Sequence, residues 1–177
     1  MLQPRDFSFI HRYFIAEKQE SLLFLIIGIA AILLGASFLF LFKNNASFFK
    51  GAAIPLLVVG IIQSVVGYTV YTRSDKQKMD VAYQVGTDPQ YIKIVEQPRM
   101  EKVMNNFVIY RYTEIALAIL GIALFVYFRK DPEKMFWKGL GLTLAAQAVL
   151  MLCADGFAEK RGADYKKELQ NFTNNVT

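Results

Sequence analysis

Hydrophobic residues gather in four long blocks along this chain, and polar stretches separate the blocks. The blocks cover residues 21–42, 51–72, 107–128 and 136–157. An α-helix needs about 20 apolar residues to cross a bilayer core of about 30 Å, and each block meets that length. The first block has no charged residue and lacks the polar face of an amphipathic helix in a soluble protein. The pattern therefore predicts four transmembrane helices.

The polar stretch between the second and third blocks, residues 72–106, is the longest in the chain. Residues 75–85 permit a helix, and Asp88 before Pro89 is a typical helix start that predicts a short linker helix ending near Glu96. Pro98 suits the first turn of the third helix, which then meets no helix breaker through Phe128. At 1.5 Å per residue this helix spans about 46 Å, so its first turns project into water.

Apolar residues also recur at helical spacing ahead of the first block, at Phe7, Ile10 and Phe14. This stripe fits a helix lying at the membrane interface or the start of a long first helix. A further alternative is that the stripe packs against the matching part of the second half of the chain. At the other end, the charged tail 158–169 permits a helix, and residues 171–177 are expected to fray.

Short motifs recur in the same order in the two halves of the chain. The matching segments, at offsets of 94 or 88 residues, are Gln3-Pro4-Arg5 with Gln97-Pro98-Arg99, Glu20 with Glu114, Phe48–Gly51 with Phe136–Gly139, and Arg73 with Arg161. We interpret them as an internal duplication, with a first repeat at 1–86 and a second at 87–177. Each repeat crosses the membrane twice, so the copies insert the same way up, related by a pseudo-two-fold axis along the membrane normal.

The expected fold is thus an all-α integral membrane protein whose four transmembrane helices form two parallel two-helix repeats. Helix 3, and with it helix 1, extends into the cytoplasm, and a short helical linker joins the repeats. Of the 20 Lys and Arg residues, 14 lie on the side of the termini and the 72–106 stretch, and six lie in the two short turns. The positive-inside rule then favours cytoplasmic termini, although the short turns are denser in charge per residue.

Ionisable residues at membrane depth are costly, so they are candidates for function. Glu114 and Asp155 lie within the third and fourth blocks, and Arg111 precedes Glu114 by one helical turn, where the two could pair. The deepest strong polar residues are Gln63 and Gln147. The other candidate ligand-binding residues are Arg73, Arg161 and Glu20.

These residues allow two interpretations. One is a polar cleft for a charged or zwitterionic ligand, or for a proton. The other is a ring of ion pairs that fixes the helix ends at headgroup level, with amide hydrogen bonds between helices deeper in the membrane.

The residues that are missing limit the chemistry. His11 and Cys153 are the only histidine and cysteine, too few for a usual zinc or haem site. No phosphate-binding loop, dinucleotide motif or nucleophile elbow occurs. We therefore expect no metal, no cofactor and no catalytic residue. The net charge of +5 is explained by cations at helix ends rather than by nucleic-acid binding.

Two functions remain open on this evidence. The first is a small polytopic membrane protein that scaffolds or modulates a membrane partner, as an oligomer. The alternative is a transporter or small-ligand-binding protein with a cleft between the repeats, lined by Glu114, Gln63 and Gln147. A lipid-modifying enzyme built on a carboxylate pair is a weaker third. The expected partners are the lipid bilayer and a second copy or a membrane protein.

Overall fold

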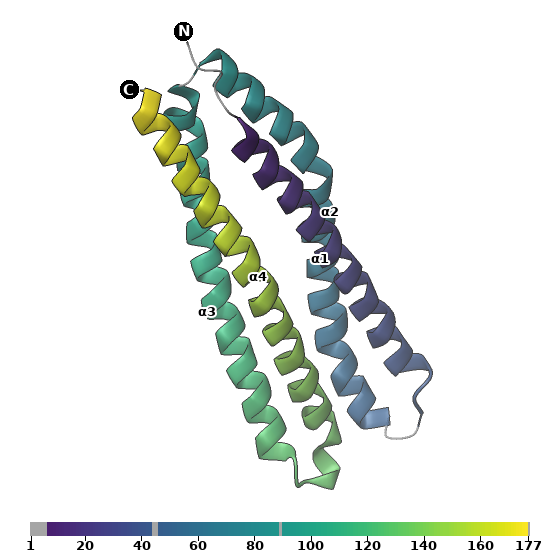
Figure 1. Ribbon diagram of the computed structural model, residues 1–177. Coiled ribbons are helices and arrows are strands. Elements are labelled where there is room, and N and C mark those ends of the chain that lie inside the picture. Colours follow the sequence, from purple (N-terminus) through teal and green to yellow (C-terminus); the bar gives the residue numbers. More distant parts are fainter. Residues whose placement is uncertain (1–6, 44–45, 89, 177) are drawn as a thin grey trace.

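Four long helices make up the part of the chain that the computed structural model describes, residues 7–43, 46–88 and 90–176 (Figure 1). The Gln3-Pro4-Arg5 motif of the first repeat lies outside these residues. In chain order the elements are α1 (Ser8–Phe40), α2 (Ala46–Thr87), the π-helix η1 (Ile92–Glu96), α3 (Gln97–Phe128), the short 3₁₀-helix η2 (Pro132–Lys134) and α4 (Met135–Val176). Pro98 lies in the first turn of α3, which directly follows η1, so the backbone is helical on both sides of it.

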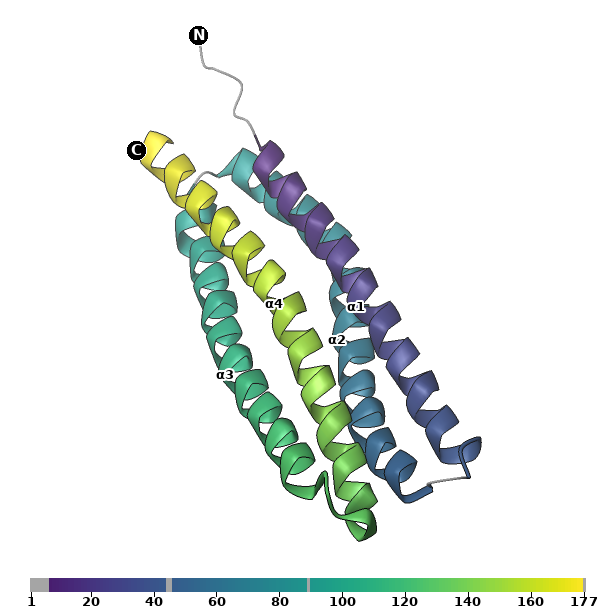
Figure 2. The same ribbon diagram turned by 60° about the horizontal axis from the view of Figure 1, so that its bottom comes forward.

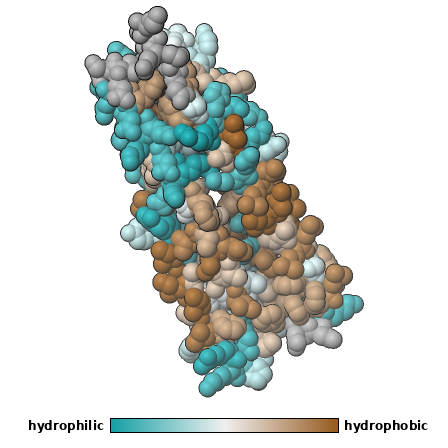
Figure 3. Space-filling model, viewed as in Figure 1, coloured by the Kyte–Doolittle hydropathy of each residue, from teal (hydrophilic) through white to brown (hydrophobic). Residues whose placement is uncertain are grey.

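Each of the four long helices contains a segment apolar enough and long enough to cross a membrane. Figure 3 shows their hydrophobic side chains as a brown zone over the lower part of the molecule, with hydrophilic residues above it. Outward-facing residues such as Leu33, Val65 and Ile119 are more than half exposed, as lipid-facing residues are. The prediction of four such helices is confirmed, and they indicate a multi-pass membrane protein.

The helices form two hairpins that lie side by side. α1 packs along α2, α3 packs along α4, and α2 and α4 form the main contact between the hairpins (Figure 2). Small residues allow close packing inside each hairpin. A Cβ atom added to Gly28 would lie 2.8 Å from the carbonyl oxygen of Gly60, and one added to Gly121 would lie 2.8 Å from that of Gly141.

Two glycines make a reciprocal contact between α2 and α4. A Cβ atom on Gly51 would collide with the carbonyl group of Phe136, and one on Gly139 would collide with that of Phe48. Only glycine lets the two backbones approach this closely. Thr143 adds a hydrogen bond across the same contact, because its Oγ1 donates to the carbonyl oxygen of Ala52 at 2.9 Å.

The helices continue beyond their apolar segments into a polar end, which we call the head: residues 7–20, 73–88, 90–106 and 158–176. The head has its own hydrophobic core, to which all four helices and η1 contribute. Its buried members are Phe9, Ile10, Tyr13, Phe14, Val81, Val85, Ile92, Met100, Tyr165 and Leu169. Burial of these residues holds together the helix ends that lie beyond the apolar segments.

The structure of the head shows how the N-terminal apolar stripe and the C-terminal tail are folded. The apolar stripe at Phe7, Ile10 and Phe14 belongs to the start of a long first helix, and Phe14 packs against Tyr165 of α4 at 6.1 Å between ring centroids. The tail is helical through Val176, so the expectation that it frays is wrong over 171–176. Its inner face packs on α1, with 5.9 Å between the rings of Phe9 and Phe172.

Gly51→Ala and Gly139→Ala should each destabilise the protein by about 1–3 kcal/mol, because the added methyl group meets backbone that has no room to move. Thermal unfolding in detergent measures the loss. Gly156→Ala is the matched control, since a Cβ atom there meets nothing within 4 Å. It should be neutral or stabilise the helix by up to about 1 kcal/mol. Equal stability of all three variants would contradict the assigned contact.

Candidate functional site

Ion pairs join the helices where the head meets the apolar segments. Arg161 of α4 pairs with Glu20 of α1, and its guanidinium lies over the ring of Tyr13 at 5.5 Å. Arg111 of α3 pairs with Glu159 of α4 at 3.2 Å. These two pairs tie α4 to α1 on one side and to α3 on the other.

Glu114 does not pair with Arg111, which it follows by one turn. Its side chain is 3% exposed, and it lies beside the carboxyl group of Asp155 of α4. With both carboxyl groups charged, neither Glu114 oxygen has a hydrogen-bond donor, and no ion pair among the described residues includes either carboxyl group. Two carboxyl groups side by side repel each other when both are charged, so this site suits a proton or a cation.

Gln63 of α2 and Gln147 of α4 are buried, with 1% and 3% exposure. The Oε1 atom of Gln63 and the Nε2 atom of Gln147 have no hydrogen-bond partner in the described structure. An unpaired buried amide group costs free energy. The two glutamines therefore leave an acceptor and a donor unused inside the apolar region.

The eight candidate residues thus form several local groups. Glu20 meets Arg161, and Glu114 meets Asp155. Arg73 is exposed and takes part in no ion pair among the described residues.

A buried polar network in the head was not predicted. Glu96, at the end of η1, has no exposed surface and receives two hydrogen bonds from Arg99, at 2.8 and 2.7 Å. Tyr165 of α4 donates a third at 2.8 Å. The spacing of Glu96 and Arg99, one helical turn apart, could have suggested their pair. Nothing in the sequence signals Tyr165.

A second buried carboxylate lies nearby, at Glu17 of α1. Tyr13 donates to its Oε1 at 3.3 Å, and Ser74 of α2 donates to its Oε2 at 3.0 Å. Burial, and then the charge of Glu17, raise the pKa of Tyr13 to about 12. The phenol therefore keeps its proton at neutral pH and remains a donor. It also stacks on Tyr165, with 4.1 Å between ring centroids.

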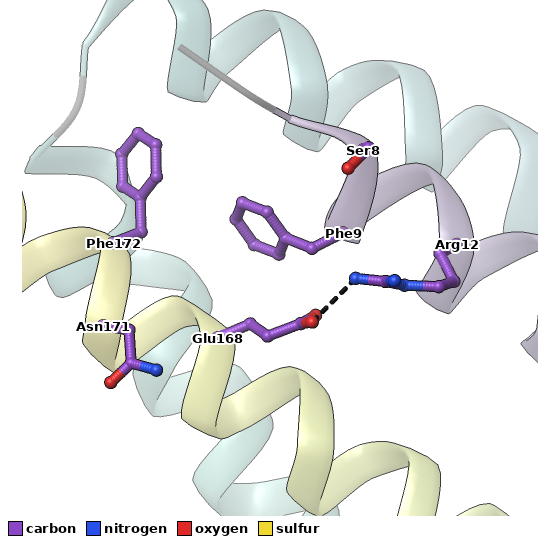
Figure 4. A pocket seen from close by; sticks show the side chains of 6 residues that line it. All are labelled: Ser8, Phe9, Arg12, Glu168, Asn171 and Phe172. Carbon is purple, nitrogen blue, oxygen red and sulfur yellow. Dashed lines mark hydrogen bonds and ion pairs between the residues drawn. The ribbon is translucent and has the colours of Figure 1, made fainter.

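Two surface hollows lie on the head. One, of about 250 Å³, is lined by Ser8, Phe9, Arg12, Glu168, Asn171 and Phe172, and the Arg12–Glu168 ion pair at 2.7 Å crosses it from α1 to α4 (Figure 4). The other, of about 360 Å³, is lined by Lys93, Gln97, Gln170, Thr173 and Asn174. Neither hollow includes any of the eight candidate residues.

No group of three or more His, Cys, Asp or Glu side chains that could hold a metal ion occurs among residues 7–43, 46–88 and 90–176. Comparison of the chain with protein-family models, curated proteins and solved structures found no match. The fold and side chains therefore define the class as far as a four-helix, multi-pass membrane protein.

Tyr165→Phe should lower the free energy of unfolding by about 2 kcal/mol, because the buried carboxylate of Glu96 loses a donor while the ring remains. Chemical or thermal unfolding in detergent, followed by circular dichroism, measures this. Tyr83→Phe is the control: Tyr83 is 71% exposed, and its change should stay within about 0.5 kcal/mol. If both variants match the wild type, the hydrogen bond to Glu96 contributes nothing to stability.

Proposed function

We propose that this protein scaffolds or modulates a membrane partner and that it acts as an oligomer. The observation that carries the proposal is the head. Its helices are held by a hydrophobic core, by the Glu96 and Glu17 networks and by ion pairs such as Arg12–Glu168. A polar structure of this kind, continuous with membrane-spanning helices, presents a surface to a partner. No nucleic acid and no cofactor enters this proposal.

The surface that would receive the partner includes two exposed apolar residues on the outside of α2. Met79 and Tyr83 are one helical turn apart and are 61% and 71% exposed. They lie in the head, beyond the apolar segment of α2, where lipid tails do not cover them. Exposed aromatic and Met side chains are enriched where proteins bind one another.

We further propose that the two hairpins are repeats of one unit, with their helices arranged in parallel. The reciprocal contact of Gly51 and Gly139 supports this, because a pseudo-two-fold axis between equivalent segments would make such a pair of contacts. We also propose cytoplasmic termini, with the head in the cytoplasm, from the larger number of Lys and Arg residues on that side.

Met79→Ser with Tyr83→Ser should weaken partner capture by about tenfold or more, as loss of central apolar anchors does at other interfaces. The measurement is chemical crosslinking in native membranes, followed by purification in mild detergent and identification of the captured proteins or second copy. Gln170→Ser, at another exposed position of the head, is the control and should capture as the wild type does.

Two outcomes would count against the scaffold proposal. One is a monodisperse monomer without a partner, both in native membranes and after purification. The other is undiminished capture by the Met79 and Tyr83 variant, which would remove these residues from the binding surface.

A second candidate function is binding or transport of a charged or zwitterionic small ligand, or of a proton. It is favoured by the buried polar atoms of Glu114, Gln63 and Gln147, which lack partners in the described structure. Such atoms at membrane depth are costly unless something pairs with them. A site between the hairpins would use these atoms.

Glu114→Gln tests this second function. Because Glu114 faces Asp155 and no cation, the change should leave thermal stability unchanged or raise it by about 1 kcal/mol. Proton uptake into vesicles with an internal pH-sensitive dye should fall at least about tenfold. Glu159→Gln, which breaks the pair with Arg111, should instead lower stability, by up to about 1 kcal/mol. Equal proton uptake by wild type and Glu114→Gln would refute the transport role.

A further inference from the structure

The two ends of the molecule differ in charge balance. The side that carries the head holds 14 Lys and Arg residues and 13 Asp and Glu residues, counting Arg111, Glu114 and Asp155 at the near ends of the apolar blocks. The opposite end, which we call the short-turn end, comprises residues 41–43, 46–50 and 129–138. It holds six cations and two acids, namely Lys43, Lys50, Arg129, Lys130, Lys134, Lys138, Asp131 and Glu133. The excess of positive charge is therefore concentrated at the short-turn end.

The ion pairs between side chains are also distributed unequally between the two ends of the molecule. All seven ion pairs formed by the described residues lie on the side of the head. At the short-turn end, Asp131 accepts a hydrogen bond from the backbone N–H of Glu133 at 2.9 Å and so caps its own turn. The six cations there have no ion-pair partner among the described residues.

The fold concentrates these cations further. Gly51 and Gly139 bring the starts of α2 and α4 into contact, and Lys50 and Lys138 are the residues that directly precede them. The other four cations lie in the two turns, and each of them is exposed.

Aromatic residues place this end at the boundary of the bilayer. Tyr127 and Trp137 are 82% and 43% exposed, at the point where α3 ends and α4 begins. Tyr and Trp prefer the depth of lipid headgroups. The uncompensated cations next to them are therefore at the level of the lipid phosphates.

We propose that the short-turn end binds the headgroups of anionic phospholipids. Zwitterionic headgroups bring a positive charge with each phosphate, so they do not neutralise a surface with an excess of cations. Anionic headgroups do, and each Lys or Arg near such a surface strengthens the attraction. The contact requires anionic phospholipid in the leaflet that the short-turn end reaches. The proposal is the same whichever of the two leaflets this is.

The single tryptophan, Trp137, reports on this surface directly. The full chain is reconstituted in phosphatidylcholine vesicles containing a small, equal fraction of dansyl-labelled lipid, either anionic or zwitterionic, in both leaflets. We expect energy transfer from Trp137 to be about twofold greater with the anionic label, and the excess to fall at high salt.

Matched lysine variants locate the effect. Lys43→Gln, Lys130→Gln and Lys134→Gln together should remove the preference for the anionic label. Lys76→Gln, Lys102→Gln and Lys167→Gln together remove the same charge from exposed positions of the head and should keep the preference. Equal transfer to both labels in the wild type would overturn the proposal. So would an equal loss in both triple variants, which would indicate a general effect of net charge.

Discussion

The approach of α2 to α4 at Gly51 and Gly139 is the contact on which the arrangement of the two hairpins depends. Within a bilayer, helices gain little from burying apolar surface, because lipid tails are equally apolar. Close backbone packing has to supply the attraction, and two glycines that each fit against the other helix's carbonyl group provide it. The hydrogen bond from Thr143 of α4 to Ala52 of α2 is directional and forms at the same contact.

The head lies beyond the apolar segments and is held together in a different way. Apolar burial is effective there, and all four helices contribute to one core. The buried carboxylates of Glu17 and Glu96 are each matched by donors from other residues. Glu114, Gln63 and Gln147 lack such donors or acceptors. The buried polar groups of the head are therefore satisfied within the fold, whereas those in the apolar region are not.

The sequence alone predicted the four membrane-spanning helices because length and lack of charge are sufficient for that inference. It also located Pro98 in the first turn of the third helix, although that helix directly follows η1 in the structure. Side-chain pairs between different helices were harder to predict from the sequence. Arg111 precedes Glu114 by one turn, yet it reaches Glu159 on α4. The direction in which Arg111 points from α3 toward α4 determines its partner. Spacing along one helix does not contain that information. The role of Tyr165 depends on the same packing.

The position of the glycine contact, far from the head, has a mechanical consequence. α4 has 42 residues and is therefore about 63 Å long. With its fulcrum near Gly139, close to the start of the helix, one degree of tilt displaces the distal end by roughly 1 Å, as in any lever of that length. The stacked rings of Tyr13 and Tyr165 lie on the long arm, with centroids 4.1 Å apart. A tilt of a few degrees at the fulcrum is thus enough to separate them, so the angle between the hairpins and the closure of the head are mechanically coupled.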